Sequence, residues 1–178
     1  MNIREKYKKE VIPAMKKQLK LANDLEVPQI KQVVVNVGVG KFLKDSSQIE
    51  DISKSLAIIT GQKPSPTPAK KSIAGFKIRE GSQVGMKVTL RGRRMWDFVE
   101  KLVKADLPRV RDFRGIKQSA VDQRGNLNIG IKEHLIFPEI SPEKVKNIFG
   151  LGITIKTNAY NKEKGTMLFK MLGFPIEK

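Results

Sequence analysis

The chain has 178 residues, of which 35 are lysine or arginine and 18 are aspartate or glutamate, giving a formal net charge of +17 at pH 7. Positive charges in such excess repel one another unless a polyanion neutralises them, so nucleic acid is the expected partner, ahead of an anionic membrane. The absence of cysteine excludes disulfides and thiolate metal sites. No apolar run approaches the roughly 20 residues that a membrane span needs. The charged first ten residues also lack the apolar centre of a secretory signal. We therefore expect a soluble, cytoplasmic protein.

The first 61 residues predict a helix, a strand and a second helix. Residues 3–19 carry an apolar side chain at every fourth position, which predicts an amphipathic helix with a basic outer face, kinked or restarted at Pro13. Alternating valines predict a strand over residues 30–39. Residues 46–60 predict a helix that Ser46 could cap and that Gly61 could end.

The middle of the chain predicts two more strands and a third helix. Three prolines in residues 64–68 exclude a central strand, because proline donates no hydrogen bond to its neighbours, and indicate an edge strand. Residues 84–91 alternate between apolar and polar side chains, as a half-buried strand does. Residues 95–103 have the spacing of a helix, which should stop near Pro108.

The last third predicts short strands around a turn. Residues 122–126 are typical of a turn that joins a short strand at 119–121 to a strand at 127–131. Pro142 predicts the start of a short helix ending before Gly150, and a strand should follow at 153–156. A final helix should begin near Asn161. Its expected buried side chains are Leu168, Met171 and Leu172.

This order of elements predicts an α+β fold in a single domain spanning residues 1–178. The expected architecture is a mostly antiparallel sheet with helices packed on one face and a polar, basic RNA-binding face on the other. The outward side chains of the expected strands are cations, amides and hydroxyls without a single acid. They are Gln32, Asn36, Lys87, Thr89, Arg91, Asn128, Lys132, Thr154 and Lys156. Such a set suits phosphates and ribose hydroxyls, and its lack of aromatic rings favours structured RNA over stacked single strands. An ordinary solvated sheet face is the alternative.

Residues 71–82 form a separate basic segment bounded by glycines. Ile73, Phe76 and Ile78 are apolar positions within it. They either tuck onto the protein's own core or belong to a mobile loop that becomes ordered against a second RNA or a protein.

The chain shows no constellation of catalytic residues. Its one histidine, His134, lies beside apolar residues, a setting more typical of a structural role than of catalysis. Gly38-Val39-Gly40 follows a strand as a dinucleotide-binding loop does, but the third glycine of that motif is missing. We expect no enzyme, no metal and no cofactor. The acids Asp97, Glu100, Asp106 and Asp112 are expected to be solvated partners of nearby cations.

Ten short segments carry a resemblance to a known family. In chain order they are VVVNVGVG (33–40), ITGQKP (59–64), AKKSIA (69–74), REG (79–81), KVTLRG (87–92), MWDF (95–98), LPRVRDFRG (107–115), GIKE (130–133), IFPEI (136–140) and LGFP (172–175). Together they closely resemble the bacterial-type ribosomal protein L5 family, which binds 5S rRNA in the central protuberance of the large subunit. The turn departs from the family pattern, with Gln123 where the family prefers glycine.

The resemblance implies a non-enzymatic role in attaching 5S rRNA to 23S rRNA, beside neighbouring large-subunit proteins. The candidate rRNA-binding residues are Gln32, Asn36, Gln62, Lys63, Thr67, Lys87, Thr89, Arg91 and Arg93. The family's basic loop reaches the P-site tRNA, which implies contacts from Lys70, Lys71, Ser72, Phe76, Lys77 and Arg79. The family also bridges to the small-subunit head protein thirteen. That bridge is expected around residues 108–115 and 133–143, with Arg109, Arg111, Asp112 and Arg114 as candidates.

Three other functions remain as alternatives. A free RNA chaperone or regulator would show little preference for 5S rRNA and would not sediment with ribosomal subunits. An RNA-modifying enzyme would need the catalytic constellation that the sequence lacks. A DNA-architectural protein would need apolar wedges for the minor groove, of which the sequence gives no sign.

Overall fold

The computed structural model describes residues 1–42, 45–76, 78–145 and 147–177. The chain divides into two compact units. Unit 1 contains residues 1–33, 90–129 and 154–178, and unit 2 contains residues 34–89 and 130–153. The prediction of a single folding domain therefore stays a prediction, which a single cooperative unfolding transition would support.

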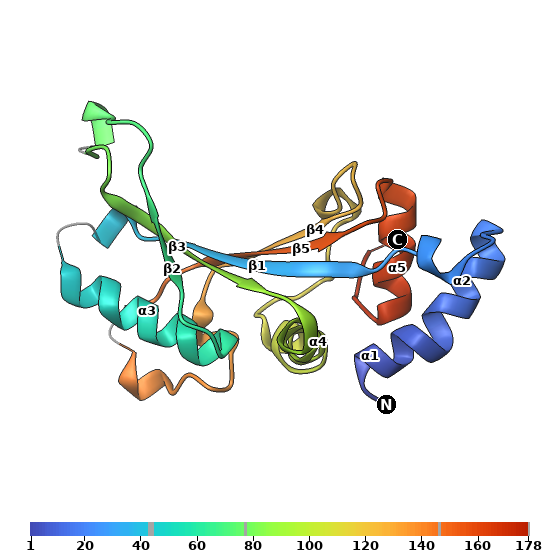
Figure 1. Cartoon of the computed structure of the whole chain (residues 1–178). Helices are drawn as coiled ribbons and strands as arrows, with labels where there is room; N and C mark the ends of the chain where they lie inside the picture. Colours follow the sequence, from blue (N-terminus) through green and yellow to red (C-terminus); the bar gives the residue numbers. More distant parts are fainter. Residues whose placement is uncertain (43–44, 77, 146, 178) are drawn as a thin grey trace. The chain divides into compact units, whose positions relative to one another are not determined.

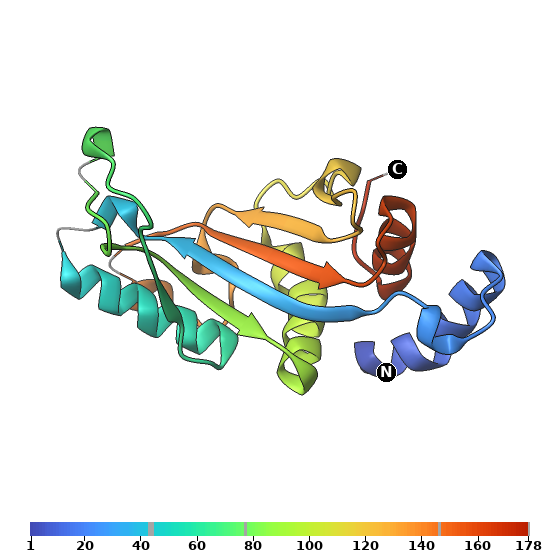
Figure 2. The same ribbon diagram turned by 45° about the horizontal axis from the view of Figure 1, so that its top comes forward.

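The strands are arranged as one sheet in the order β2-β3-β1-β5-β4. Their bounds are β1 (Ile30–Gly38), β2 (Ser65–Pro68), β3 (Gln83–Leu90), β4 (Leu127–Ile131) and β5 (Leu151–Thr157). The arrows of β1 and β4 run opposite to those of β3 and β5 in Figure 2, and β2 pairs antiparallel with β3. The sheet is therefore antiparallel, and together with the helices it confirms the α+β class. The proline-rich strand β2 is an edge strand, as expected.

Unit 2 is built on the apolar side of β1. Val35, Val37 and Val39 are fully buried, whereas Asn36 and Gly38 between them are exposed, so the period-two pattern holds. The helix α3 (Ser46–Thr60) runs along one side of these strands (Figure 1). Its apolar stripe is buried at Ile52, Leu56 and Ile59. The helix ends at Gly61 with φ +67°, the left-handed conformation that suits glycine.

The first helix of unit 1 is interrupted near Pro13, as the sequence predicted. It comprises α1 (Ile3–Lys6), a π-helical turn (Tyr7–Val11) and α2 (Ile12–Leu19). Pro13 lies in the first turn of α2, where its missing N–H costs little. The side chain of Tyr7 donates a hydrogen bond to the Pro28 carbonyl at 3.1 Å, and burial raises its pKa to about 12.

Two further helices complete unit 1. The helix α4 (Gly92–Lys101) continues through a π-helical turn (Leu102–Asp106) into a 3-10 turn (Leu107–Arg109) that contains Pro108. The helix α5 (Lys162–Leu172) is capped by Asn161, whose side-chain oxygen accepts the Glu163 N–H at 2.9 Å. Gly173, with φ +99°, ends it.

Two predicted elements are wrong. Residues 119–121 are not a strand, because Gln118–Ala120 form a 3-10 turn and only Val121 pairs with Leu127. The helix expected after Pro142 is a single 3-10 turn, Pro142–Lys144. It does not reach residue 149, since the Phe149 backbone is hydrogen-bonded to His134 instead.

Three smaller expectations also need correction. The N-cap of α3 is Asp45 rather than Ser46. Met171 is only half-buried, because it lines an open hollow, whereas Leu168 and Leu172 are buried as expected. Asp106 is fully buried rather than solvated. In the described part of the chain, no helix is both long and apolar enough to cross a membrane.

Candidate nucleic-acid interface

In unit 1, neighbouring strands fix two pairs of polar side chains. Arg91, one residue beyond β3, donates a hydrogen bond from Nη2 to Oε1 of Gln32 on β1 at 2.9 Å. Thr154 on β5 donates to Oδ1 of Asn128 on β4 at 2.8 Å. Arg91 is exposed and Gln32 is half-buried. A guanidinium carries five N–H donors, so one bond to Gln32 orients the group and leaves other donors for a ligand.

Arg93 is the one rRNA-binding candidate that lies on a helix. It belongs to the first turn of α4 and forms an ion pair with Asp97 on the next turn, with Nε 3.7 Å from Oδ2. Its side chain is 89% exposed. It also lines a hollow together with Arg4, Lys8, Glu5 and Asp97, so Arg93 belongs to a helical cluster of mixed charge rather than to a strand face.

In unit 2, the segment after α3 is attached to strand β3. The amide of Gln62 donates a hydrogen bond from Nε2 to the carbonyl of Thr89 at 3.3 Å. The hydroxyl of Thr60 donates to the Leu56 carbonyl at 2.7 Å and lies 3.1 Å from the Gln62 carbonyl, which holds this segment against the helix end. Lys63 follows directly and is exposed. Gln62, Lys63 and Thr89 are thereby brought together from separate parts of the sequence.

Three other candidates in unit 2 lie on the strands themselves. Asn36 on β1 and Lys87 on β3 are both exposed. Thr67 on the edge strand β2 is opposite Gly85 of β3, and its hydroxyl oxygen is buried without a hydrogen-bond partner among the described residues. A buried hydroxyl without a partner is costly.

The predicted tRNA-binding loop is a hairpin over residues 69–82. Ile73 and Ile78 exchange backbone hydrogen bonds at 2.9 and 3.2 Å, and the Glu80 N–H donates to the Ser72 hydroxyl at 2.9 Å. Figure 1 shows the hairpin extending beyond the strands β2 and β3 from which it arises. These hydrogen bonds give the segment the backbone pairing of a hairpin.

Most of the described side chains of this hairpin are exposed. Lys70, Lys71, Ser72 and Arg79 are at least partly exposed, and Phe76 is 74% exposed. Lys77, also a candidate, lies outside the described residues. Of the three apolar positions, Ile73 and Phe76 do not tuck onto the core, whereas Ile78 is half-buried. The sequence left open whether these residues pack on the core or remain available to a partner. In the structure Ile78 is partly covered, whereas Ile73 and Phe76 are exposed.

The candidate bridge residues lie on an exposed segment of unit 1. Arg109, Arg111, Asp112 and Arg114 are all at least partly exposed. Their segment ends at Gly115, with φ +111°, where an added Cβ would lie 2.9 Å from the Glu177 side chain. The Ile116 N–H then donates to the Pro175 carbonyl at 2.7 Å, so the C-terminal residues hold one end of this segment. The second range, 133–143, belongs to unit 2.

The turn before β4 shows why Gln123 is tolerated there. The carboxylate of Asp122 accepts hydrogen bonds from the Arg124 and Asn126 backbone and from the Asn126 side chain, all between 2.8 and 2.9 Å. Burial alone would raise the pKa of this carboxyl, but the donors outweigh burial and hold the pKa below its usual range. The positive φ, +78°, falls at Gly125, and Gln123 is free of that constraint.

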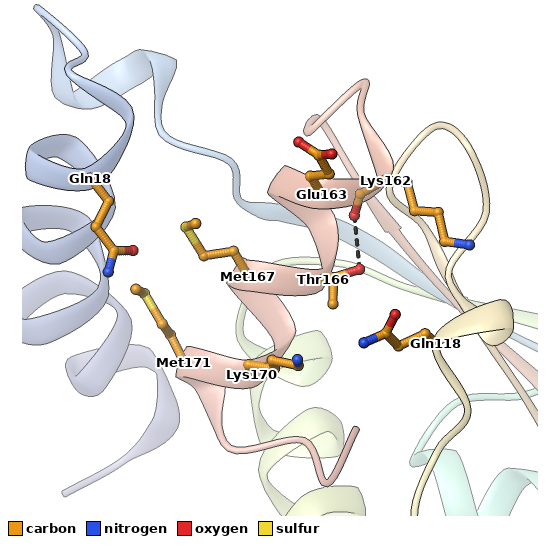
Figure 3. A pocket seen from close by; sticks show the side chains of 8 residues that line it. All are labelled: Gln18, Gln118, Lys162, Glu163, Thr166, Met167, Lys170 and Met171. Atoms are coloured by element: carbon orange, nitrogen blue, oxygen red, sulfur yellow. Dashed lines mark hydrogen bonds between the residues drawn. The ribbon is translucent and has the colours of Figure 1, made fainter. Parts of the chain in front are cut away.

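A hollow of about 510 Å³ in unit 1 contains none of the predicted site residues (Figure 3). The side chains of Met167 and Met171 on α5 point toward Gln18 of α2, and Gln118 lies on the other side of α5. Lys162 and Lys170 lie at its rim. Among the described residues, no cluster of three histidine or acidic side chains could hold a metal ion.

Comparison with known proteins identifies the family of this chain. The family model for ribosomal protein L5 matches residues 23–79, and a second model, which describes the C-terminus of the same ribosomal family, matches residues 83–176. This chain belongs to the ribosomal protein L5 family. Membership of a family of ribosomal proteins bears out the expectation that the chain is not an enzyme.

Three relatives in this family match almost the whole chain. The large ribosomal subunit protein uL5 of Halothermothrix orenii and that of Rubrobacter xylanophilus are each 48% identical over 174 residues, covering 98% of this chain and 97% of the relative. The uL5 protein of Streptococcus thermophilus is 48% identical over 176 residues, covering 99% and 98%. The resemblance expected from the short segments therefore extends along the whole chain.

Proposed function

We propose that this L5-family chain is a structural constituent of the large ribosomal subunit that binds 5S rRNA and helps attach it to 23S rRNA. The relatives that are 48% identical to it are named as large-subunit proteins. The observation that carries the proposal is the fixed arrangement of polar side chains in each unit, with Arg91 held by Gln32 and Gln62 held by Thr89.

Fixed side chains suit a structured RNA. An arginine that is already oriented loses less conformational entropy when it binds a phosphate, and its planar fork matches two phosphate oxygens. Amides and hydroxyls at fixed positions can then set the register through ribose hydroxyls and base edges. The exposed cations Lys63 and Lys87 add charge neutralisation.

Two finer roles belong to the same proposal. The hairpin 69–82 would contact P-site tRNA, because its cations and Phe76 are exposed. The segment 108–115 would bridge to the small-subunit head protein thirteen, because its arginines are exposed while its far end is held by the C-terminal residues.

The decisive experiment is a binding titration of the purified protein against 5S rRNA, with tRNA and duplex DNA as competitors at several salt concentrations. If about six phosphates are engaged, the affinity should fall roughly a thousandfold between 50 and 200 mM salt. We expect a preference for 5S rRNA that survives added salt, because hydrogen bonds from fixed side chains are not released with counterions. Equal binding to all three nucleic acids, lost together with salt, would favour the free RNA chaperone instead.

A further inference from the structure

Two glycines at the end of β1 have no explanation within the fold. Gly38 and Gly40 do not have positive φ angles, and a Cβ added to either would have no neighbour within 4 Å. Glycine weakens a strand, and a glycine that the fold does not need leaves bare backbone that a ligand can approach closely. Gly150 differs, since its Cβ would lie 3.0 Å from the Ile131 carbonyl.

The same glycines line a pocket within unit 2. This pocket has a volume of about 510 Å³ and is also lined by Phe42, Phe76, Ile148 and Lys41. Phe76 is 74% exposed and Ile148 is 56% exposed, so each presents apolar surface that a ligand in this pocket could cover. Among the described residues that line it, Lys41 is the one charged group. The pocket therefore combines bare backbone, apolar side chains and a single cation.

We propose that this pocket binds one unstacked nucleobase of an RNA, with the attached phosphate near Lys41. A flat aromatic ring can lie against the bare peptide groups of Gly38 and Gly40, where a methyl group would hold it away. The ring of Phe76 offers a stacking partner, since nucleobases stack on aromatic side chains whatever their identity. The inference rests on the proposed RNA-binding function and adds to it a site that reads an unpaired nucleotide.

The charge of the surroundings favours a nucleotide over a peptide. The hairpin that carries Phe76 also carries Lys70, Lys71 and Arg79 and one acid, Glu80. An anionic ligand with an apolar, planar part satisfies both the cations and the apolar wall. A peptide would need acidic and aromatic residues together to satisfy the same surroundings.

The test compares two short RNAs on wild-type protein and on matched glycine variants. The probe is a single-stranded hexa-adenylate with one 2-aminopurine, and its control carries an abasic site at the same position. We expect wild-type protein to bind the intact oligonucleotide about tenfold more tightly, as one stacked base contributes, and to change the 2-aminopurine fluorescence. Gly40→Ala should bring the ratio close to one. Gly130→Ala on β4, where a Cβ also meets nothing within 4 Å, should leave it unchanged.

Several outcomes would overturn the proposal. They are equal affinity for the two oligonucleotides, an unchanged ratio in Gly40→Ala, or tighter binding of an acidic peptide that contains one phenylalanine. If an alanine variant fails to fold, Phe76→Leu keeps the apolar volume, removes the ring and should lower the ratio. Binding of 5S rRNA is measured beside each arm, so loss of the nucleobase site with retained 5S affinity separates this inference from the proposed function.

Discussion

Several glycines and polar side chains of unit 1 have neighbours that explain them, whereas several of unit 2 do not. In unit 1, Gly125 and Gly165 are glycines because their backbones touch, and Arg91 and Asp122 have neighbours that hold them. Unit 2 contains Gly38, Gly40, the hydroxyl of Thr67, Nε2 of His134 and the ring of Phe76, for which the described residues offer no such need or partner. The exposed residues among them, Gly38, Gly40 and Phe76, are candidates for contacts with a ligand.

Among the proposed substitutions, we expect Gly165→Ala to have the largest effect on the free energy of unfolding. In Gly165→Ala, the new Cβ would lie 2.5 Å from the Gly125 Cα, closer than any van der Waals contact. We expect a loss of about 3 kcal/mol in the free energy of unfolding, even though alanine is the better helix former. Urea denaturation measures this loss. Gly38→Ala is the matched substitution in unit 2 and should change stability by less than about 1 kcal/mol. Similar losses in both variants would remove the distinction between the units.

Arg91→Ala tests whether the held side chains of unit 1 also bind RNA. Removing one charged hydrogen-bonding group should weaken 5S rRNA binding about tenfold, equivalent to about 1.4 kcal/mol. It should also reduce the slope of log affinity against log salt by about one. Arg91→Lys is the control, because it keeps the charge but loses the planar fork, so the slope should remain while the affinity drops. An unchanged slope in the alanine variant would show that Arg91 meets no phosphate.

His134 provides a smaller, pH-dependent effect in unit 2. Its ring is fully buried, stacks on Phe149 at 3.9 Å between centroids, and accepts the Phe149 N–H at Nδ1. Burial lowers the pKa of His134 below its ordinary value of 6.5. As the pH falls, His134 is therefore protonated in the unfolded chain before it is protonated in the folded one. The contribution of His134 to stability is present above pH 6.5 and is lost as the pH drops toward the folded pKa. His134→Gln should flatten the pH dependence of unfolding between about pH 7.5 and 5.5. An equally steep profile in the variant would assign the effect to other groups.

The hairpin of unit 2 should have the smallest effect on 5S rRNA. Deleting residues 75–79 removes Phe76 and Arg79 and leaves the Gln62–Thr89 contact in place. We expect an unchanged 5S affinity and weaker binding of P-site tRNA to ribosomes that contain the variant, measured by filter binding. If 5S affinity falls as much as in Arg91→Ala, then the hairpin and the strands form one surface for the same RNA.

Local patterns predicted much of the fold. Strands β1, β3 and β5 and helices α3 and α5 follow the sequence because apolar residues at a regular period bury one face of each element. Gly61 and Gly173 end their helices with positive φ, as their positions suggested. The predictions failed at 119–121 and 142–150, where no periodic pattern is long enough to decide. There, backbone hydrogen bonds between distant residues, such as His134 with Phe149, override local preference.

The sequence by itself determined the charge and the family, because composition and local motifs do not depend on packing. Tertiary structure decided which polar side chains are held and which are free. Gln32 and Arg91 are 59 positions apart, and Gln62 and Thr89 are 27 apart, so no local pattern could pair them. It also decided which glycines the fold requires. Gly165 and Gly38 look alike in a sequence, and only the atoms around each of them show that the first is needed for packing and the second is not.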